Sequence, residues 1–140
     1  MKMFALVFSL FFFQNQPENT PDNVHNLTVT VKNVSKSEGI ISVSIYNTED
    51  GFLKTAYKKQ KVSAVANQEV QVVFDDLPAG TYTVSAVHDV NSNGELDTNF
   101  FGMPTEPYAI SKDGKNMYGP PSFDKAVFEI TQDQSLDLQF

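Results

Sequence analysis

Hydrophobic residues recur at every second position through most of the chain, and this alternation limits what the chain can fold into. A period of two places successive side chains on opposite faces of an extended strand, so each run buries one face. The pattern therefore indicates half-buried strands rather than amphipathic helices. The apolar faces are Leu27, Val29 and Val31; Ile41, Val43 and Ile45; Val70, Val72 and Phe74; Tyr82, Val84 and Ala86; Ala126, Phe128 and Ile130; and Leu136, Leu138 and Phe140.

The connections between these runs favour a sandwich. Pro78 and Gly80 mark a tight turn, because proline fixes φ and glycine accepts unusual backbone angles, and a further strand is expected at 61–66. Strands joined by short turns predict an all-β fold, an antiparallel seven-stranded sandwich of the immunoglobulin or prealbumin type. Residues 48–59 form either one or two helical turns or an irregular loop that holds Phe52 and Leu53 over the core.

The first residues have the composition of an export signal. Lys2 supplies a positive charge, and residues 4–13 form an apolar run that is too short to span a bilayer as a helix. We predict a signal peptide at 1–14, a polar linker at 15–25 and a β-sandwich domain at 26–140. The expected destination is the periplasm, the cell surface or the extracellular space. An uncleaved interfacial anchor is the alternative.

Composition restricts the partners. A chain of 140 residues, 41% of them hydrophobic, can bury one core. The net charge of -7 argues against nucleic acid as a partner, since phosphates are bound by excess positive charge. The chain has no cysteine, so disulfides and a lipid-modified cysteine are excluded. No stable membrane span is expected after signal cleavage.

Residues 89–97 read Asp-Val-Asn-Ser-Asn-Gly-Glu-Leu-Asp, which is the spacing of a calcium loop. Side-chain oxygens at the first, third and fifth positions can converge on one cation if Gly94 turns the chain with a positive φ. The expected calcium ligands are Asp89, Asn91, Asn93, the Glu95 carbonyl and Asp97.

The loop is not an EF-hand, because its flanks look like strands and its twelfth residue is Phe100. With few charged ligands the affinity should be weak, with a Kd of roughly 0.1 to 1 mM, unless a distant acid completes the shell. Glu106, Asp113 and Asp124 are the candidates for that acid. The alternative is an ordinary turn at Asn93-Gly94 that is capped by polar side chains without metal.

The long connection from residue 89 to about 125 is expected to form an ordered cap whose first turn the calcium ion would hold. Tyr108, Tyr118 and Phe123, beside Glu106, form either a platform for a glycan or peptide or the packing of the cap on the sandwich. The aromatic and apolar residues expected to bury their side chains in the cap are Phe100, Phe101, Tyr108, Met117, Tyr118 and Phe123.

Enzymatic groups are scarce in the chain. By alternation His88 shares the buried face of its strand, and no cysteine or strained Gly-x-Ser-x-Gly turn accompanies it, so we predict a core histidine and no catalytic triad. We therefore expect a non-enzymatic binding or structural module. The alternative is a hydrolase that uses acids of the 97–124 loop, such as Glu106 with Asp124.

An ordered series of short blocks resembles the bacterial family called domain of unknown function 2141. The blocks are Leu-Thr-Val-Thr-Val at 27–31, Glu-Asp-Gly-Phe-Leu at 49–53, Leu-Pro-Ala-Gly-Thr-Tyr at 77–82, the run 88–99, Glu-Pro-Tyr at 106–108 and Gly-Pro-Pro-Ser-Phe at 119–123. The resemblance covers roughly residues 25 to 140 and implies an exported bacterial protein without an established activity. The stretch 74–82 is also similar to transthyretin-like and carboxypeptidase-regulatory-like sandwiches, which implies a stalk or binding module.

Overall fold

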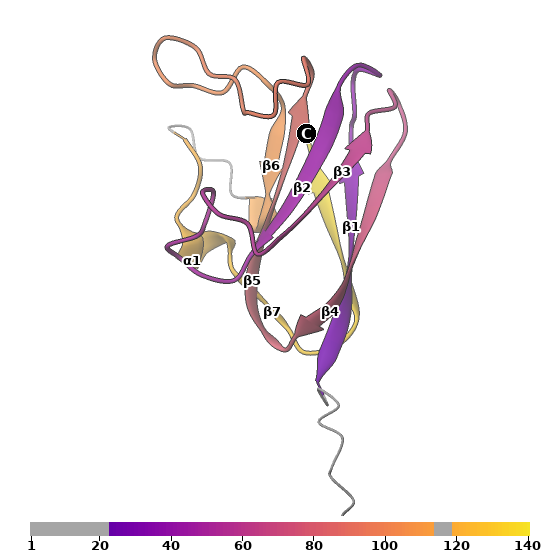
Figure 1. Ribbon diagram of the computed structural model, residues 1–140, viewed down its shortest axis with the longest axis vertical. Coiled ribbons are helices and arrows are strands. Elements are labelled where there is room, and N and C mark those ends of the chain that lie inside the picture. The colour runs from indigo at the N-terminus through magenta and orange to yellow at the C-terminus, as the bar shows by residue number, and fades with distance from the viewer. Residues whose placement is uncertain (1–22, 114–118) are drawn as a thin grey trace, which may run out of the picture.

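The computed structural model describes residues 23–113 and 119–140 as a sandwich of two β-sheets (Figure 1). One sheet has three strands in the order β4-β1-β8, and the other has five, with β3-β2-β5-β6 in line and β7 paired with β5. The strands are β1 (Val24–Lys32), β2 (Ile40–Tyr46), β3 (Lys58–Ser63), β4 (Val70–Pro78), β5 (Gly80–Asp89), β6 (Tyr108–Ile110), β7 (Phe128–Ile130) and β8 (Gln134–Gln139). The helical elements are a 3₁₀ turn at Ser111–Asp113 and the single-turn helix α1 (Phe123–Ala126).

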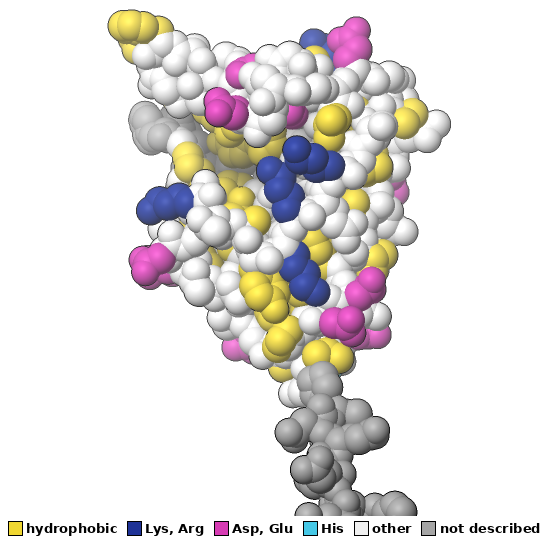
Figure 2. Space-filling view, in the orientation of Figure 1, with side chains coloured by type: hydrophobic (Ala, Val, Ile, Leu, Met, Phe, Trp, Pro, Cys, Tyr) yellow, Lys and Arg dark blue, Asp and Glu magenta, His cyan; other side chains and the backbone are white. Residues whose placement is uncertain are grey.

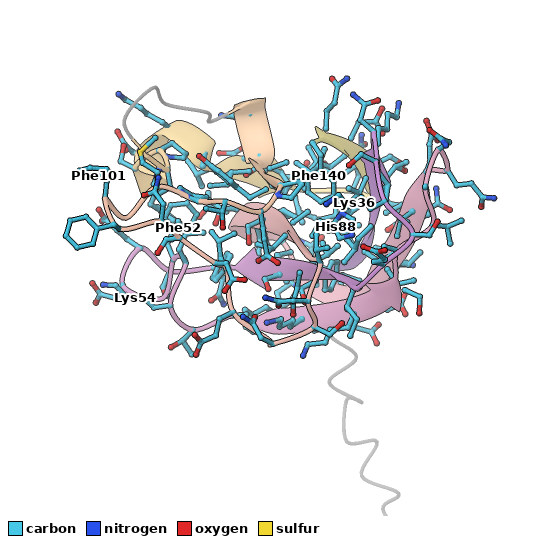
Figure 3. All side chains as sticks on the ribbon, turned by 90° about the horizontal axis from the view of Figure 1, so that it is seen from above. Lys36, Phe52, Lys54, His88, Phe101 and Phe140 are labelled. Atoms are coloured by element: carbon cyan, nitrogen blue, oxygen red, sulfur yellow. The ribbon has the colours of Figure 1, made fainter. Side chains whose placement is uncertain are left out.

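The core lies between the sheets and consists of the alternating apolar residues. The predicted inward faces of β1, β2, β4 and β5 are all buried there, so the all-β sandwich is confirmed. His88 is also fully buried, as alternation predicts; its Nε2 lies 2.8 Å from the carbonyl oxygen of Glu38, and its ring stacks on Phe140 (Figure 3). A protonated Nε2 donates to that carbonyl, which provides a hydrogen bond for one nitrogen of the buried ring.

The strand count and direction differ from the prediction of seven antiparallel strands. Eight strands lie within the described residues, and the unpredicted one is β6, whose three residues are too few to show an alternating pattern. In addition, β1 and β8 run parallel, from the pair Leu27–Gln134 to the pair Lys32–Gln139. Alternation identifies the buried face of a strand but contains no information about its direction.

Several boundaries also differ. Strand β1 begins at Val24, within the predicted linker of 15–25. Strand β3 begins at Lys58 and the preceding residues form turns, so the irregular-loop interpretation of 48–59 is the correct one, with Phe52 buried and Leu53 half-exposed. The predicted signal peptide and the rest of that linker lie outside the described residues.

A buried serine joins the pairings of β5 with β6 and β7. Strand β6 pairs with residues 85–87 of β5, and β7 pairs with residues 80–82. Between these two pairings the Val84 N–H donates to Ser111 Oγ at 3.1 Å, and the Ser111 hydroxyl donates to the Ala126 carbonyl at 2.6 Å. One hydroxyl thus satisfies two buried backbone groups that the ladder leaves unpaired.

The opposite side of the sandwich is closed by side chains. Strands β3 and β4 are edge strands of different sheets, and unpaired edges can bind other strands. Lys58 and Gln60 of β3 donate side-chain hydrogen bonds to the carbonyl oxygens of Asp75 and Val73 in β4. These bonds occupy backbone acceptors that would otherwise be exposed along the edge of β4.

A second apolar cluster forms a cap on part of the outer face of the larger sheet. Of the residues predicted to fill the cap, Tyr108 and Phe123 pack in it, and Met117 and Tyr118 lie outside the described residues. The buried members of this cluster include Tyr46, Phe52 and Ala126, and Phe123 packs against them. The rings of Tyr46 and Phe52, and of Phe52 and Phe123, meet edge to face with centroids 5.7 Å apart. The cap therefore unites the β2–β3 connection, β6 and α1 over one sheet face.

Phe100 and Phe101 are not part of the cap, contrary to the prediction. Their side chains are 97% and 85% exposed, and Phe101 projects away from the molecule (Figure 3). They form the tip of a small hairpin closed by the bridge between Thr98 and Pro104. Asn99 Oδ1 accepts the N–H groups of Phe101 and Met103, so local hydrogen bonds rather than burial determine the shape of the tip.

Candidate functional site

The predicted calcium loop begins at the last residue of β5. Asp89 is buried, its Oδ1 accepts the Asn93 N–H at 3.0 Å, and its Oδ2 accepts the Gly94 N–H at 2.8 Å. Gly94 has φ of 87°, as expected, so the chain can fold back over the Asp89 carboxylate. The Asp89 carboxylate therefore stabilises the turn by accepting two backbone N–H groups of the loop.

Three further predicted ligands meet one another directly. The amide of Asn91 donates to Asp97 Oδ2 at 2.6 Å, and that of Asn93 donates to Asp97 Oδ1 at 2.8 Å. The amide oxygens of Asn91 and Asn93 accept the N–H groups of Asn93 and Glu95. The structure thus brings Asn91, Asn93 and Asp97 together around one carboxylate.

Glu106 joins the two ends of this loop. It arrives from the far side of the 98–104 hairpin and is only 9% exposed. Its Oε1 accepts the Val90 N–H at 2.8 Å, and its Oε2 accepts the Asp97 N–H at 3.1 Å. Charge-assisted bonds of this kind are the stronger class of hydrogen bond, so one side chain holds both the entry and the exit of the loop.

The loop also rests against the β1–β2 connection. Gly39 has φ of 81°, and a Cβ atom added there would lie 2.1 Å from the Asp89 carbonyl oxygen and 2.6 Å from the Val90 Cα. Only glycine allows this approach of the two backbones. Residues far apart in the sequence therefore fix the position at which the loop leaves β5.

The acids of the loop form no ion pair within residues 23–113 and 119–140. The ion pairs found there involve His25 or Lys32 and none of the loop's acids. Nor does any set of three His, Cys, Asp or Glu side chains in this part of the chain cluster as a metal site would. A cation here would therefore depend on amide and carbonyl oxygens as well as carboxylates, which are the ligands that calcium accepts.

Of the other predicted site residues, Tyr108 and Phe123 lie in the cap, whereas Glu106 contacts the loop. Tyr108 is half-buried in β6, Phe123 packs in the cap, and Tyr118 lies outside the described residues. Glu106 belongs to the loop rather than to an aromatic platform. Phe123 and Tyr108 thus contribute to the packing of the cap, and Tyr108 also reaches a surface depression.

Glu106 and Asp124, the two acids suggested for a hydrolase, lie in different environments. Both oxygens of Glu106 accept backbone N–H groups, whereas Asp124 is exposed in the first turn of α1. A hydrogen bond from the Ser122 side chain lowers the pKa of Asp124 below its ordinary value of 3.8. The side chain of Asp113 lies outside the described residues. The hydrolase alternative stays a prediction without a specific arrangement to support it.

Together these features define an all-β sandwich domain with an acidic, oxygen-rich loop at one end. The chain belongs to the family described as uncharacterized protein conserved in bacteria (DUF2141), which matches residues 29–138. This result confirms the family resemblance of the sequence blocks. Comparison with curated proteins and with solved structures finds no match.

Proposed function

We propose that this protein is an exported, non-enzymatic binding module in which a calcium ion bound by residues 89–97 orders the β5–β6 connection. The observation that carries the proposal is the meeting of Asn91, Asn93 and Asp97, braced by Asp89 and Glu106. The atoms available to bind an ion are carboxylate and carbonyl oxygens, together with the amide oxygens of the two asparagines once those amides rotate. Such hard oxygen ligands suit calcium rather than zinc.

The two asparagine amides explain how the loop could exist with and without the ion. As described, their N–H groups face Asp97 and neutralise it in part. Rotation of each amide by half a turn would direct Oδ1 toward the same carboxylate, and oxygen facing oxygen requires a cation between them. The rotation gives up the bonds that the two amide oxygens accept from the Asn93 and Glu95 N–H groups, so the ion must also offset that loss. The protein ligands would then be the carboxylates of Asp89 and Asp97, the amide oxygens and the Glu95 carbonyl.

Export is supported by the first residues of the chain. Lys2 followed by the apolar run 4–13 has the composition of a signal peptide. Among the described residues no helix has the length and apolarity needed to cross a membrane. Expression with a C-terminal tag, followed by cell fractionation and mass determination of the mature N-terminus, tests export; an unprocessed protein in the cytoplasmic fraction would contradict it.

Calorimetric titration tests the calcium site. Wild-type protein should bind one calcium with a Kd in the range of roughly 0.1 to 1 mM. Asp97→Asn should abolish the heat because it removes the carboxylate on which both asparagines converge. Asp75→Asn is the matched control, since Asp75 is an exposed acid on β4 far along the chain from the loop. Equal heats from the two variants would exclude the site.

A further inference from the structure

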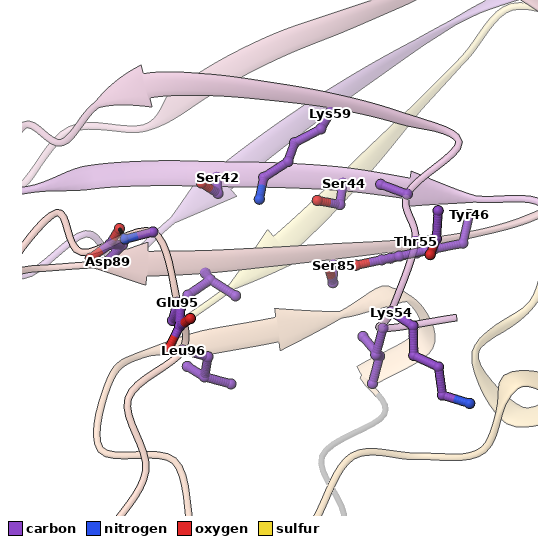
Figure 4. A pocket seen from close by; sticks show the side chains of 14 residues that line it. Ser42, Ser44, Tyr46, Lys54, Thr55, Lys59, Ser85, Asp89, Glu95 and Leu96 are labelled. Atoms are coloured by element: carbon purple, nitrogen blue, oxygen red, sulfur yellow. Dashed lines mark hydrogen bonds between the residues drawn. The ribbon is translucent and has the colours of Figure 1, made fainter. Parts of the chain in front are cut away.

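A groove of about 440 Å³ crosses the outer face of β2 and β5. Its floor contains the small side chains of Ser42, Ser44 and Ser85. One wall is residues 53–56 of the β2–β3 connection, and the other is residues 94–96 of the calcium loop, as Figure 4 shows. The volume lies within the roughly 300 to 1,000 Å³ of small-molecule sites.

The groove continues into an apolar end. A depression of about 160 Å³ shares Tyr46, Leu53 and Leu96 with it and extends to Tyr108 and Pro104. Figure 2 shows this region as a hollow with hydrophobic atoms at its base, and lysine side chains lie on the neighbouring surface. A ligand in the groove would therefore meet polar groups at one end and apolar surface at the other.

The polar floor has unused hydrogen-bonding groups. Ser44 is only 6% exposed, yet neither its hydroxyl nor that of Ser42 makes a hydrogen bond within the described residues. Figure 4 shows the Lys59 ammonium group lying between these two serines, whereas Lys54 points away. Lys59 has no ion-pair partner among the same residues. Lys59 is exposed, and neither serine hydroxyl is among the buried atoms without a partner, so these groups are open to the groove and available to a ligand.

We propose that this groove binds a saccharide. Serine hydroxyls both donate and accept, Lys59 donates, and Glu95 on the opposite wall accepts, which matches the mixed donors and acceptors of sugar hydroxyls. The apolar end, with the Tyr108 ring, suits the apolar face of a sugar ring. A simple anion fits less well, because Asp89 and Glu95 line the same groove as Lys59.

The groove and the calcium loop share a wall, so their ligands should be coupled. Gly94, Glu95 and Leu96 lie between the predicted calcium ligands Asn93 and Asp97. Fixing the loop would reduce the ordering cost of saccharide binding and raise its affinity. This coupling rests on the proposed function. The groove shares only Asp89 and Glu95 with the predicted calcium ligands, and its serine floor and Lys59 are separate from them.

Chemical-shift titration of the ¹⁵N-labelled full chain tests the proposal. The saccharide probes are maltotriose, cellotriose and chitobiose. Hexanoate and a tri-leucine peptide, added in separate titrations, represent other ligand classes. Each is added to about 20 mM, which detects millimolar binding. At least one saccharide should shift the amides of β2 and residues 94–96. Lys59→Gln and Ser44→Val should each weaken binding about tenfold or more, whereas Lys61→Gln, on the same strand outside the groove, should not.

The outcomes separate the two proposals. No shift with any saccharide, or shifts with hexanoate or peptide alone, would overturn the groove assignment whether or not calcium binds. Saccharide binding that persists unchanged in chelator, with no heat of calcium binding, would retain the groove and refute the calcium site. Thermal unfolding of each variant identifies misfolding, and Lys59→Gln, at an exposed position, provides the test if Ser44→Val does not fold.

Discussion

The Oε2 atom of Glu106 accepts a hydrogen bond of 3.1 Å from the backbone N–H of Asp97. Its Oε1 accepts the Val90 N–H at 2.8 Å, so both ends of the 89–97 loop depend on this carboxylate. Glu106→Gln keeps the shape but replaces one acceptor with a donor. We expect a loss of about 1 to 3 kcal/mol in the free energy of unfolding, measured in urea.

The matched control for Glu106→Gln is Glu129→Gln, because Glu129 is exposed on β7. This change should alter the free energy of unfolding by less than about 0.5 kcal/mol. Equal effects of the two variants would show that the bonds of Glu106 do not hold the loop.

Gly39 supports the loop by allowing close approach. Gly39→Ala would place a Cβ atom 2.1 Å from the Asp89 carbonyl oxygen and would force φ of 81° on a residue with a side chain. We expect a loss of more than about 2 kcal/mol. Gly102→Ala is the control: its φ is 76° but nothing lies within 4 Å of the added atom, so it should cost only about 1 kcal/mol. Similar denaturant midpoints for the two variants would refute the close contact.

Ser111 should matter far more to stability than an exposed serine. Removing its hydroxyl leaves the Val84 N–H and the Ala126 carbonyl without their side-chain partner. Because unsatisfied buried groups cost about 1 to 3 kcal/mol each, Ser111→Ala should lower the free energy of unfolding by about 2 to 4 kcal/mol. Ser135→Ala, at an exposed position of β8, should have almost no effect. An unchanged unfolding midpoint for Ser111→Ala would contradict the bridging role.

Ionisation of Tyr82 should lower the free energy of unfolding at high pH. Its hydroxyl donates to the Pro78 carbonyl at 2.7 Å, and burial, followed by the nearby Tyr57, raises its pKa above the ordinary value of 10.0. Since the folded state favours the neutral phenol, this contribution is complete below pH 10.0 and disappears as the pH rises through the raised pKa. Tyr82→Phe should lose about 1 kcal/mol at neutral pH and show a shallower decline above pH 10.

Urea unfolding across this pH range checks the Tyr82 prediction. Tyr57→Phe is the comparison, because Tyr57 is 42% exposed; this variant should keep most of the decline. An equally steep decline in wild type and Tyr82→Phe would assign the loss to other groups.

The sandwich was predictable because its strands are long enough for alternation to appear. Leu27, Val29 and Val31 mark their buried face without any tertiary information. The three residues of β6 do not reveal a buried face in this way, because they form a strand only through pairing with β5. Nor could alternation reveal that Phe100 and Phe101 are exposed, because Asn99 determines the backbone of that tip through hydrogen bonds.

The candidate sites were predictable to different degrees. The loop from Asp89 to Asp97 is contiguous, so its spacing is visible in the sequence, but the role of Glu106 depends on how the hairpin returns it. The groove was not predicted. Ser44 and Ser85 are cross-strand partners, and their small size hollows the sheet face, yet in the sequence each is only the polar residue of an alternating strand. The signal that could have revealed the groove is serine at successive outward positions of β2.

Thermal unfolding of the chelator-treated protein, repeated with about 10 mM calcium, shows whether the folded protein binds calcium. For a Kd near 0.5 mM, binding to the folded state alone adds about 2 kcal/mol and raises Tm by several degrees. We expect this rise for wild type and for Asp75→Asn, and no rise for Asp97→Asn. An unchanged Tm for wild type, together with no calorimetric heat, would show that residues 89–97 form a hydrogen-bonded turn that does not bind calcium.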